Sequence, residues 1–137
     1  MNQDRTTPVA TEEPRSEINR ITERIINCVY RVSNTLGSGF LEKVYENAVA
    51  IELWKNGLRV EQQRPIKVFC EKNLVGDFVA DLLVEDSVIV ELKAAKTVVE
   101  VHSAQCMNYL KATGLKVCLL VNFGRPRVDV KRVVLDF

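Results

Sequence analysis

The segment that most restricts how this chain can fold is residues 116–123, KVCLLVNF, an almost unbroken apolar run of strand length. Such a run is typical of a strand that is buried on both faces, because a strand with one solvated face alternates apolar and polar residues. It needs neighbouring strands and other elements packed against them, so we expect a sheet with helices against it. The length of 137 residues suits one such domain with one hydrophobic core.

Hydrophobic periodicity predicts the other elements. Over residues 16–36 the apolar residues recur every three or four positions, which indicates one buried stripe on a helix. A second helix follows two glycines, and four of its residues are predicted on its buried side: Leu41, Val44, Ala48 and Ile51. Further along, the patterns predict strands over residues 66–70, 74–84, 87–93, 116–123 and 128–137, with a helix over 98–113.

The predicted class is therefore α/β, with the element order ααβββαββ and one folded domain over residues 16–137. Residues 1–15 contain Thr, Pro, Glu and Arg without periodicity, and we expect them to form a mobile tail. No internal repeat is visible, so the domain is expected to have a single core.

Composition indicates the class and the location of the protein but not its activity. Apolar residues make up 47% and charged residues 27%, the ordinary balance of a globular protein. No apolar run approaches the ~20 residues that cross a bilayer. The polar N-terminus lacks the apolar core of a secretory signal, so we expect a cytoplasmic protein without membrane contact. The net charge of +1 neither requires nor excludes a nucleic-acid partner, and four cysteines without zinc-binding spacing are interpreted as packing residues.

Polar residues interrupt the apolar pattern of two adjacent predicted strands. Glu91 and Lys93 lie two positions apart, so their side chains point to one face of the strand and Leu92 points to the other. Asp81 lies opposite Glu91 only if the hairpin has an odd loop, such as the three residues 85–87. A two-residue loop without a bulge would turn Asp81 to the opposite face.

In the register with the three-residue loop, two carboxylates and a lysine converge in one layer of side chains. The two anions repel each other, and a divalent cation with oxygen ligands relieves that repulsion. The pattern therefore predicts a Mg²⁺ site, with Mn²⁺ as a substitute, of the kind that hydrolyses phosphodiester bonds. The alternative is a cross-strand ion pair on a solvated sheet face, although Val88, Ile89 and Val90 favour a strand that is buried on both faces.

Three blocks of the sequence resemble a known family. Gly39-x-x-Glu42-x-x-Tyr45 occurs within LGSGFLEKVYENA and is followed by VGDFVADLLVEDSVIVELKA and AQCMNYLKATGLKVCLLVNFG. In this order, over about residues 18–135, the blocks resemble the GxxExxY proteins, a branch of the PD-(D/E)XK nuclease superfamily. The resemblance implies a restriction-endonuclease-like fold, with a mixed central β-sheet flanked by helices.

The resemblance also implies roles for individual residues. Three acidic residues would hold the metal: Glu42, Asp81 and Glu91. Lys93 would be the catalytic lysine, and Gln105 would be the accessory glutamine of the following helix. Ala80 stands where the full motif of the superfamily has a proline.

Other residues are candidates for substrate contact. They are Tyr45, Lys96, Arg125 and Arg127, and the two arginines are included because a guanidinium binds phosphate with two hydrogen bonds. A solvated loop is the alternative for residues 124–127. Glu42 also suits the positive end of a helix dipole, and Tyr45 also suits a half-buried packing position.

Together these patterns predict a metal-dependent nuclease that hydrolyses phosphodiester bonds, with DNA ahead of RNA as its substrate. The alternative is a catalytically weak or inactive binding or assembly module on a nuclease-like scaffold. The near-neutral charge and the small size favour that alternative. A homodimer is compatible with both.

Overall fold

The structure is a computed structural model that describes residues 3–97 and 100–137. Its elements are α1 (Gln3–Leu36), α2 (Glu42–Lys55), β1 (Val60–Cys70), β2 (Asn73–Val84), β3 (Val88–Lys93), α3 (Glu100–Thr113), β4 (Val117–Asn122) and β5 (Asp129–Val134). The strands form one five-stranded sheet in the order β1-β2-β3-β4-β5, in which β3 and β4 run parallel and the other neighbours antiparallel. The predicted α/β class, the mixed sheet and the order ααβββαββ are confirmed.

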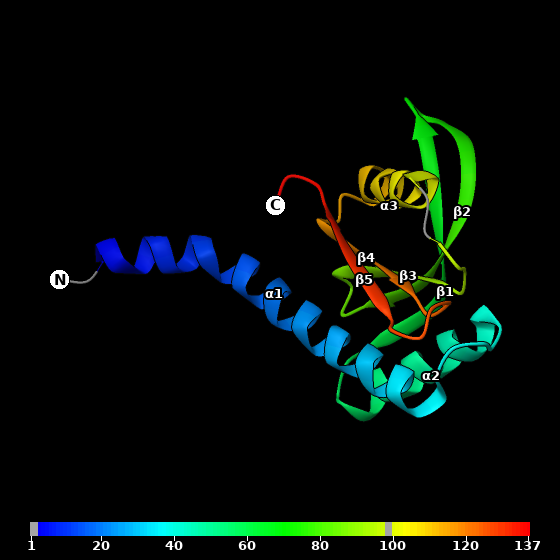
Figure 1. Ribbon diagram of the computed structural model, residues 1–137. Helices are drawn as coiled ribbons and strands as arrows, with labels where there is room; N and C mark the ends of the chain where they lie inside the picture. The colour runs from blue at the N-terminus through cyan, green and yellow to red at the C-terminus, as the bar shows by residue number, and fades with distance from the viewer. Residues whose placement is uncertain (1–2, 98–99) are drawn as a thin grey trace.

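Helices cover both faces of the sheet (Figure 1). α1 and α2 pack on one face, against residues such as Val90 and Leu119, and α3 packs on the other, against Ile89 and Leu120. Every residue of β4 is buried. The double burial predicted within residues 116–123 is therefore confirmed, because β4 is an inner strand with helices on both sides.

The first helix is longer than the periodicity predicted. α1 begins at Gln3, whereas the apolar stripe indicated a start near residue 16. The stripe itself is confirmed, since Ile21 and Val29 are buried in the core. In Figure 1 the first turns extend beyond the sheet. Periodicity marks where a helix packs, and a helix can continue past its packed part because its backbone hydrogen bonds are local. The mobility of residues 1–15 stays a prediction.

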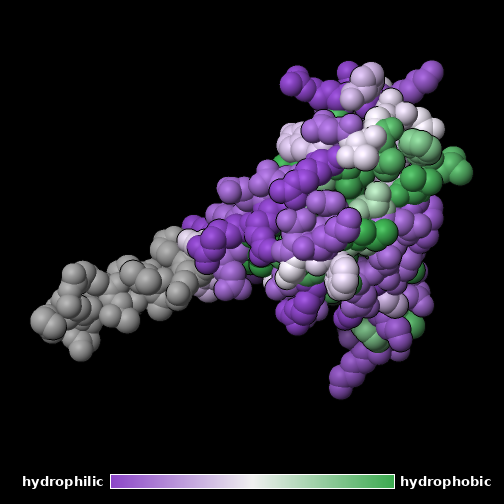
Figure 2. Space-filling model, turned by 90° about the horizontal axis from the view of Figure 1, so that it is seen from below, coloured by the Kyte–Doolittle hydropathy of each residue, from purple (hydrophilic) through white to green (hydrophobic). Residues whose placement is uncertain are grey.

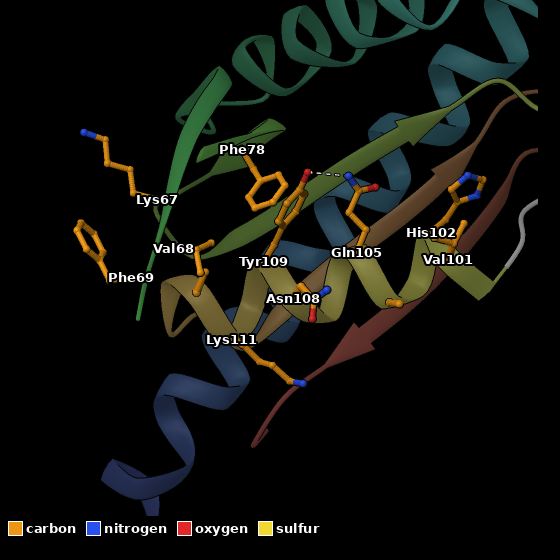
Figure 3. Close-up of a pocket in the computed structure, with 12 residues that line it drawn as sticks. Lys67, Val68, Phe69, Phe78, Val101, His102, Gln105, Asn108, Tyr109 and Lys111 are labelled. Atoms are coloured by element: carbon orange, nitrogen blue, oxygen red, sulfur yellow. Dashed lines mark hydrogen bonds between the residues drawn. The ribbon is translucent and has the colours of Figure 1, made fainter. Parts of the chain in front are cut away.

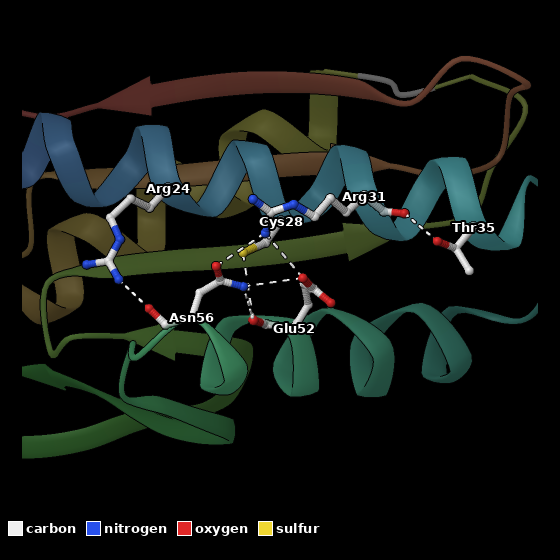
Figure 4. A network of polar contacts seen from close by, with 6 residues as sticks. All are labelled: Arg24, Cys28, Arg31, Thr35, Glu52 and Asn56. Carbon is white, nitrogen blue, oxygen red and sulfur yellow. Dashed lines mark hydrogen bonds and ion pairs between the residues drawn. The ribbon is translucent and has the colours of Figure 1, made fainter.

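A polar network joins α1 to α2 (Figure 4). Arg31 Nη1 donates to Glu52 Oε2 and to Asn56 Oδ1, both at 3.2 Å. The side-chain amide of Asn56 donates to the Glu52 carbonyl at 2.8 Å, and Arg24 donates to the Asn56 carbonyl. These contacts fix the C-terminal end of α2 against α1.

The predicted buried face of α2 is wrong for three of its four residues. Leu41, Val44 and Ile51 are exposed by 80%, 39% and 56%, whereas Ala48 is partly buried against the core. Viewed from below, on the side of α2, the molecule shows apolar surface among its hydrophilic residues (Figure 2). The buried side instead carries five residues: Tyr45, Glu46, Val49, Ala50 and Leu53. Because α2 is apolar on two sides, its periodicity does not select the face. The stacking of Tyr45 on Phe123, with ring centroids 4.3 Å apart, favours the observed one.

The first strand starts earlier than predicted and forms a long hairpin with the second. β1 begins at Val60 and passes through Pro65, which an edge strand tolerates. The pairs between β2 and β3 run from Leu82 to Val84, so the outer part of the hairpin extends past β3 and lies beside α3 (Figure 1). We call residues 66–78 of this hairpin the hairpin arm.

The remaining elements agree with the patterns. The helix predicted over residues 98–113 is α3, and its first two predicted positions lie outside the described residues. The segment 128–137, predicted to form one or two strands, contains β5. The four cysteines are free thiols. Cys28, Cys106 and Cys118 are buried, as expected of packing residues, whereas the expectation is wrong for Cys70, which is exposed. Within the described ranges, no helix combines the length and the apolarity needed to cross a bilayer.

Candidate active site

The turn between β2 and β3 decides whether Asp81 shares a face with Glu91. Val84 pairs with Val88, so residues 85–87 form the predicted three-residue loop. Its first two residues both adopt a left-handed φ of 53°, as in a tight hairpin turn. The same register, continued along the strands, places Asp81 opposite Glu91.

At that position side chains replace backbone acceptors between the strands. Asp81 N donates to Glu91 Oε2 at 2.7 Å, and Leu92 N donates to Asp81 Oδ2 at 2.8 Å. Ile89, two positions before Glu91, packs against α3, so Glu91 points to the α3 face of the sheet. Each carboxylate is tied through one oxygen to the backbone of the other strand, which leaves its second oxygen for a ligand.

The two carboxyl groups are held where ionisation is unfavourable. Burial, and then the charge of Asp81, raise the pKa of Glu91 to about 8, against the opposing effects of the Asp81 N–H and of Lys93. Burial also raises the pKa of Asp81, and the hydrogen bond from Leu92 opposes that rise. Two adjacent carboxyl groups in such a site favour a shared proton or a bound cation.

Lys93 lies at the end of β3, half-buried, on the same face as Glu91. Its positive charge lowers the pKa of both Asp81 and Glu91. Among the described residues Lys93 takes part in none of the ion pairs. Its ammonium group is therefore available to a negatively charged ligand.

The start of α2 brings further carboxylates to the end of β3. Glu42 is the first residue of α2, and its Oε2 accepts a hydrogen bond from Ala94 N at 3.3 Å. Its charge raises the pKa of both Asp81 and Glu91, which places it in their electrostatic neighbourhood. Glu42 thus lies beside the strand ends, and its role as a metal ligand stays a prediction.

Glu46 is a residue of this site that the sequence did not single out. It is 4% exposed, and its charge raises the pKa of Asp81 more than that of Glu42 does. Gln63 donates to Oε1 at 2.8 Å, and Oε2 accepts from Gln62 at 2.8 Å and Lys43 at 3.0 Å. The signal was its spacing of one helical turn from Glu42, on the face of α2 that proved to be buried.

Gln105 approaches the site from α3, and its role as the accessory glutamine stays a prediction. In the described part of the chain its amide donates to the Tyr109 hydroxyl at 2.9 Å, and that hydroxyl contacts the Val79 carbonyl at 3.5 Å. Burial and then the charge of Glu91 raise the pKa of Tyr109 to about 12. Gln105 is therefore bonded to a tyrosine that lies in the electrostatic neighbourhood of Glu91.

A second residue that the sequence did not single out, in this case without any signal, holds the segment after Lys93. Asn122 is 1% exposed. Its Oδ1 accepts from Ala95 N and Gly124 N, both at 3.0 Å, and its amide donates to Ala95 O at 2.8 Å. A Cβ at Gly124 would lie 2.1 Å from Ala95 O, so only glycine permits this approach of two backbones.

The four residues expected to touch substrate are not equivalent. Tyr45 is fully buried, its hydroxyl donates to Gly37 O at 2.6 Å, and its ring packs in the core, so it cannot meet a substrate at the surface. The expectation for Tyr45 is corrected, because the core selected its side of α2. Lys96, Arg125 and Arg127 are exposed, and Arg125 pairs with Asp129 at 3.7 Å.

The donor set suits a magnesium ion that keeps part of its water. Among the described residues, no three acidic, histidine or cysteine side chains form a ready cluster for a metal. Asp81 and Glu91 nevertheless share one face, with one oxygen each outside their protein hydrogen bonds. Mg²⁺ in proteins is held by one or two carboxylates plus water and substrate oxygens, and it would relieve the repulsion between these two groups.

Comparisons with known proteins support this fold. The crystal structure of SSO0001 is similar, with a TM-score of 0.55 and 13% sequence identity, over 69% of this chain and 51% of that chain. At this identity the likeness concerns the fold alone, and the present chain spans about half the length of that relative. A comparison with curated proteins finds no match. A model of the PD-(D/E)XK nuclease superfamily matches residues 19–133, and because this match spans most of the sequence, the chain belongs to that superfamily.

Proposed function

We propose that this protein is a Mg²⁺-dependent nuclease of the GxxExxY branch that hydrolyses phosphodiester bonds, with DNA ahead of RNA as its substrate. One observation carries the proposal. Asp81 and Glu91 are locked side by side by reciprocal backbone hydrogen bonds, with Lys93 on the same face. A cross-strand ion pair on a solvated surface, the alternative for this pattern, does not explain a Glu91 that is 3% exposed.

Each residue has a distinct task in this proposal. Asp81 and Glu91 would hold the metal, and Glu42 would complete its acidic surroundings directly or through water. When bound, Mg²⁺, or Mn²⁺ in its place, supplies a polarised phosphoryl oxygen and an activated water. Lys93 offsets the negative charge that builds on the phosphoryl group. Glu46 keeps Gln62 and Gln63 in place and adds negative charge near Asp81.

Lys93→Ala tests the chemistry. It is expected to lower the cleavage rate of labelled DNA in Mn²⁺ buffer by at least roughly 100-fold, because a positioned charge at the reacting phosphate is lost. Lys116→Ala, which removes an exposed lysine just before β4, serves as the matched control and is expected to cut like the parent. Equal rates for the parent and Lys93→Ala would rule out the proposed role.

A binding or assembly module without turnover is the second candidate function. The net charge of +1 and the lack of a ready metal cluster among the described residues favour it. Calorimetric titration with Mn²⁺ separates the two. A nuclease should show binding heat that Asp81→Asn removes, whereas an inert module should give the same trace for parent and variant.

Two expectations about the setting of the protein also stay proposals. We propose a cytoplasmic location, which fractionation of cells can test, and a homodimer, which light scattering on the purified chain can test. A monomer at all concentrations would contradict the homodimer and leave the assignment of the carboxylates unaffected.

A further inference from the structure

A large hollow lies beside the carboxylate site, between the hairpin arm and α3. Its volume is about 810 Å³, within the range of pockets that hold small molecules and cofactors. Figure 3 shows Val68 and Phe78 of the arm facing Tyr109 and Gln105 of α3 across this space. We call this hollow the arm groove.

The groove presents an aromatic surface to solvent. Phe78 is 47% exposed, although its ring is supported on two sides. A Cβ at Gly76 would lie 3.0 Å from the ring, and the Tyr109 ring lies 6.1 Å away at an angle of 52°. A single exposed phenylalanine is common on protein surfaces, but one that is braced inside a hollow marks a surface for a flat ligand.

The polar residues of the groove favour an anionic ligand with hydrogen-bonding edges. Among the described residues that line it there are two lysines, Lys67 and Lys111, and no carboxylate. Gln105 and Asn108 lie along the same helix, and a side-chain amide can both donate to and accept from a base edge.

The groove adjoins the candidate active site. Tyr109 lines the groove, and its hydroxyl reaches the Val79 carbonyl at 3.5 Å, two residues before Asp81 on β2. Asp81 lies on the same strand as Phe78, three residues further on. A nucleotide chain whose phosphate reaches Asp81 and Glu91 would therefore place a neighbouring base at the arm groove.

We propose that the arm groove binds an unpaired nucleobase of the substrate, stacked on Phe78, with Lys111 near its phosphate. This inference rests on the proposed function and makes it more specific, since the substrate then has a single-stranded stretch next to the scissile bond. Bases inside a duplex already stack on one another and cannot offer a face to Phe78, whereas an unpaired base can.

Binding without cleavage tests the proposal. The affinity for a short fluorescein-labelled oligothymidylate is measured by anisotropy in metal-free buffer, beside a blunt duplex of the same length. Phe78→Ala is expected to weaken oligothymidylate binding about tenfold, as removal of one stacking platform does, and to change duplex binding by less than about twofold. Phe78→Trp keeps a platform and is expected to retain the affinity of the parent.

Trp54→Ala is the matched control. Trp54 is another exposed aromatic residue, at 72%, and it lies on α2, away from the residues that line the groove. It should bind oligothymidylate within about twofold of the parent. Equal losses in both alanine variants, no loss in Phe78→Ala, or no affinity of the parent for the oligonucleotide would each overturn the proposal.

Cleavage in Mn²⁺ is measured in parallel, so that the two proposals can fail separately. If the parent never cuts DNA but Phe78→Ala selectively loses oligothymidylate binding, the nuclease assignment is wrong and the proposal for the groove stands. A parent that cuts, with Phe78→Ala binding normally, would remove the groove and keep the nuclease. An oligouridylate of equal length shows whether the groove distinguishes RNA from DNA.

Discussion

Glu91 is a carboxyl group that the fold keeps almost entirely out of water, with 3% of the residue exposed. Its pKa is raised from 4.5 to about 8, chiefly by burial. Between these two pH values the folded chain holds a proton that the unfolded chain has released. The free energy of unfolding therefore falls as the pH rises through this window. The contribution of Glu91 to stability is largest below pH 4.5, where the group is protonated in both states.

Glu91→Gln should remove this pH dependence, because glutamine retains the shape and an acceptor oxygen but does not ionise. In metal-free buffer above pH 8 the variant should be more stable than the parent by a few kcal/mol, since each tenfold change in an ionisation constant corresponds to about 1.4 kcal/mol. The difference should shrink as the pH approaches 4.5. Urea unfolding over this pH series measures it, with Glu23→Gln as an exposed control. Parallel stability curves for Glu91→Gln and the parent would contradict the buried ionisation.

At the scale of the elements, the site depends on how the ends of β3 and β4 are joined. The two strands are parallel neighbours, so their C-terminal ends meet at one edge of the sheet. Asn122 ties the segment after Lys93 to β4 through Ala95, and Gly124 lies against the same backbone. This packing holds Lys93 beside the two carboxylates.

Gly124→Ala should disturb that edge, because the added Cβ would lie 2.1 Å from the Ala95 carbonyl oxygen and backbone would have to move. We expect a loss of about 1–3 kcal/mol in the free energy of unfolding, as for other overpacked sites, and a lower cleavage rate. Pro126→Ala, at an exposed position in the same loop, is the control and should leave stability nearly unchanged. Equal melting temperatures for Gly124→Ala and the parent would show that the loop relaxes freely.

At the scale of the whole molecule, only part of the longest helix, α1, packs against the sheet. α1 and α2 bury one face of the sheet and α3 the other, and the core residues described on α1 fall within residues 18–36. The first turns of α1 extend away from the sheet (Figure 1). The domain is therefore expected to fold without them.

Deletion of residues 1–13 should change the melting temperature by no more than about 2 °C, because the packed stripe of α1 stays intact. Ile25→Ala, at a core position that is fully buried, should instead cost about 2–5 kcal/mol. Thermal unfolding of both variants checks the contrast. A large loss on deletion would show that the first turns pack against the domain.

Local patterns in the sequence predicted where most of the strands lie and left two registers open, of which the one with the three-residue loop brings Asp81, Glu91 and Lys93 together. The physical reason is that side-chain alternation and the length of one loop act over a few residues, so residues 85–87 determined which face Asp81 occupies. The same local rule placed residues 116–123 in a strand that is buried on both faces.

Only the tertiary structure decided which residues of the helices join the site. α2 has apolar residues on two sides, and packing against Phe123 buried Tyr45 and Glu46 while leaving Leu41 in solvent. Tyr109 meets Val79, and Asn122 meets Ala95, through contacts that the docked helices and strands create. Such contacts depend on how whole helices dock on the sheet, and a stripe of apolar residues specifies that a helix docks without specifying which neighbours it meets.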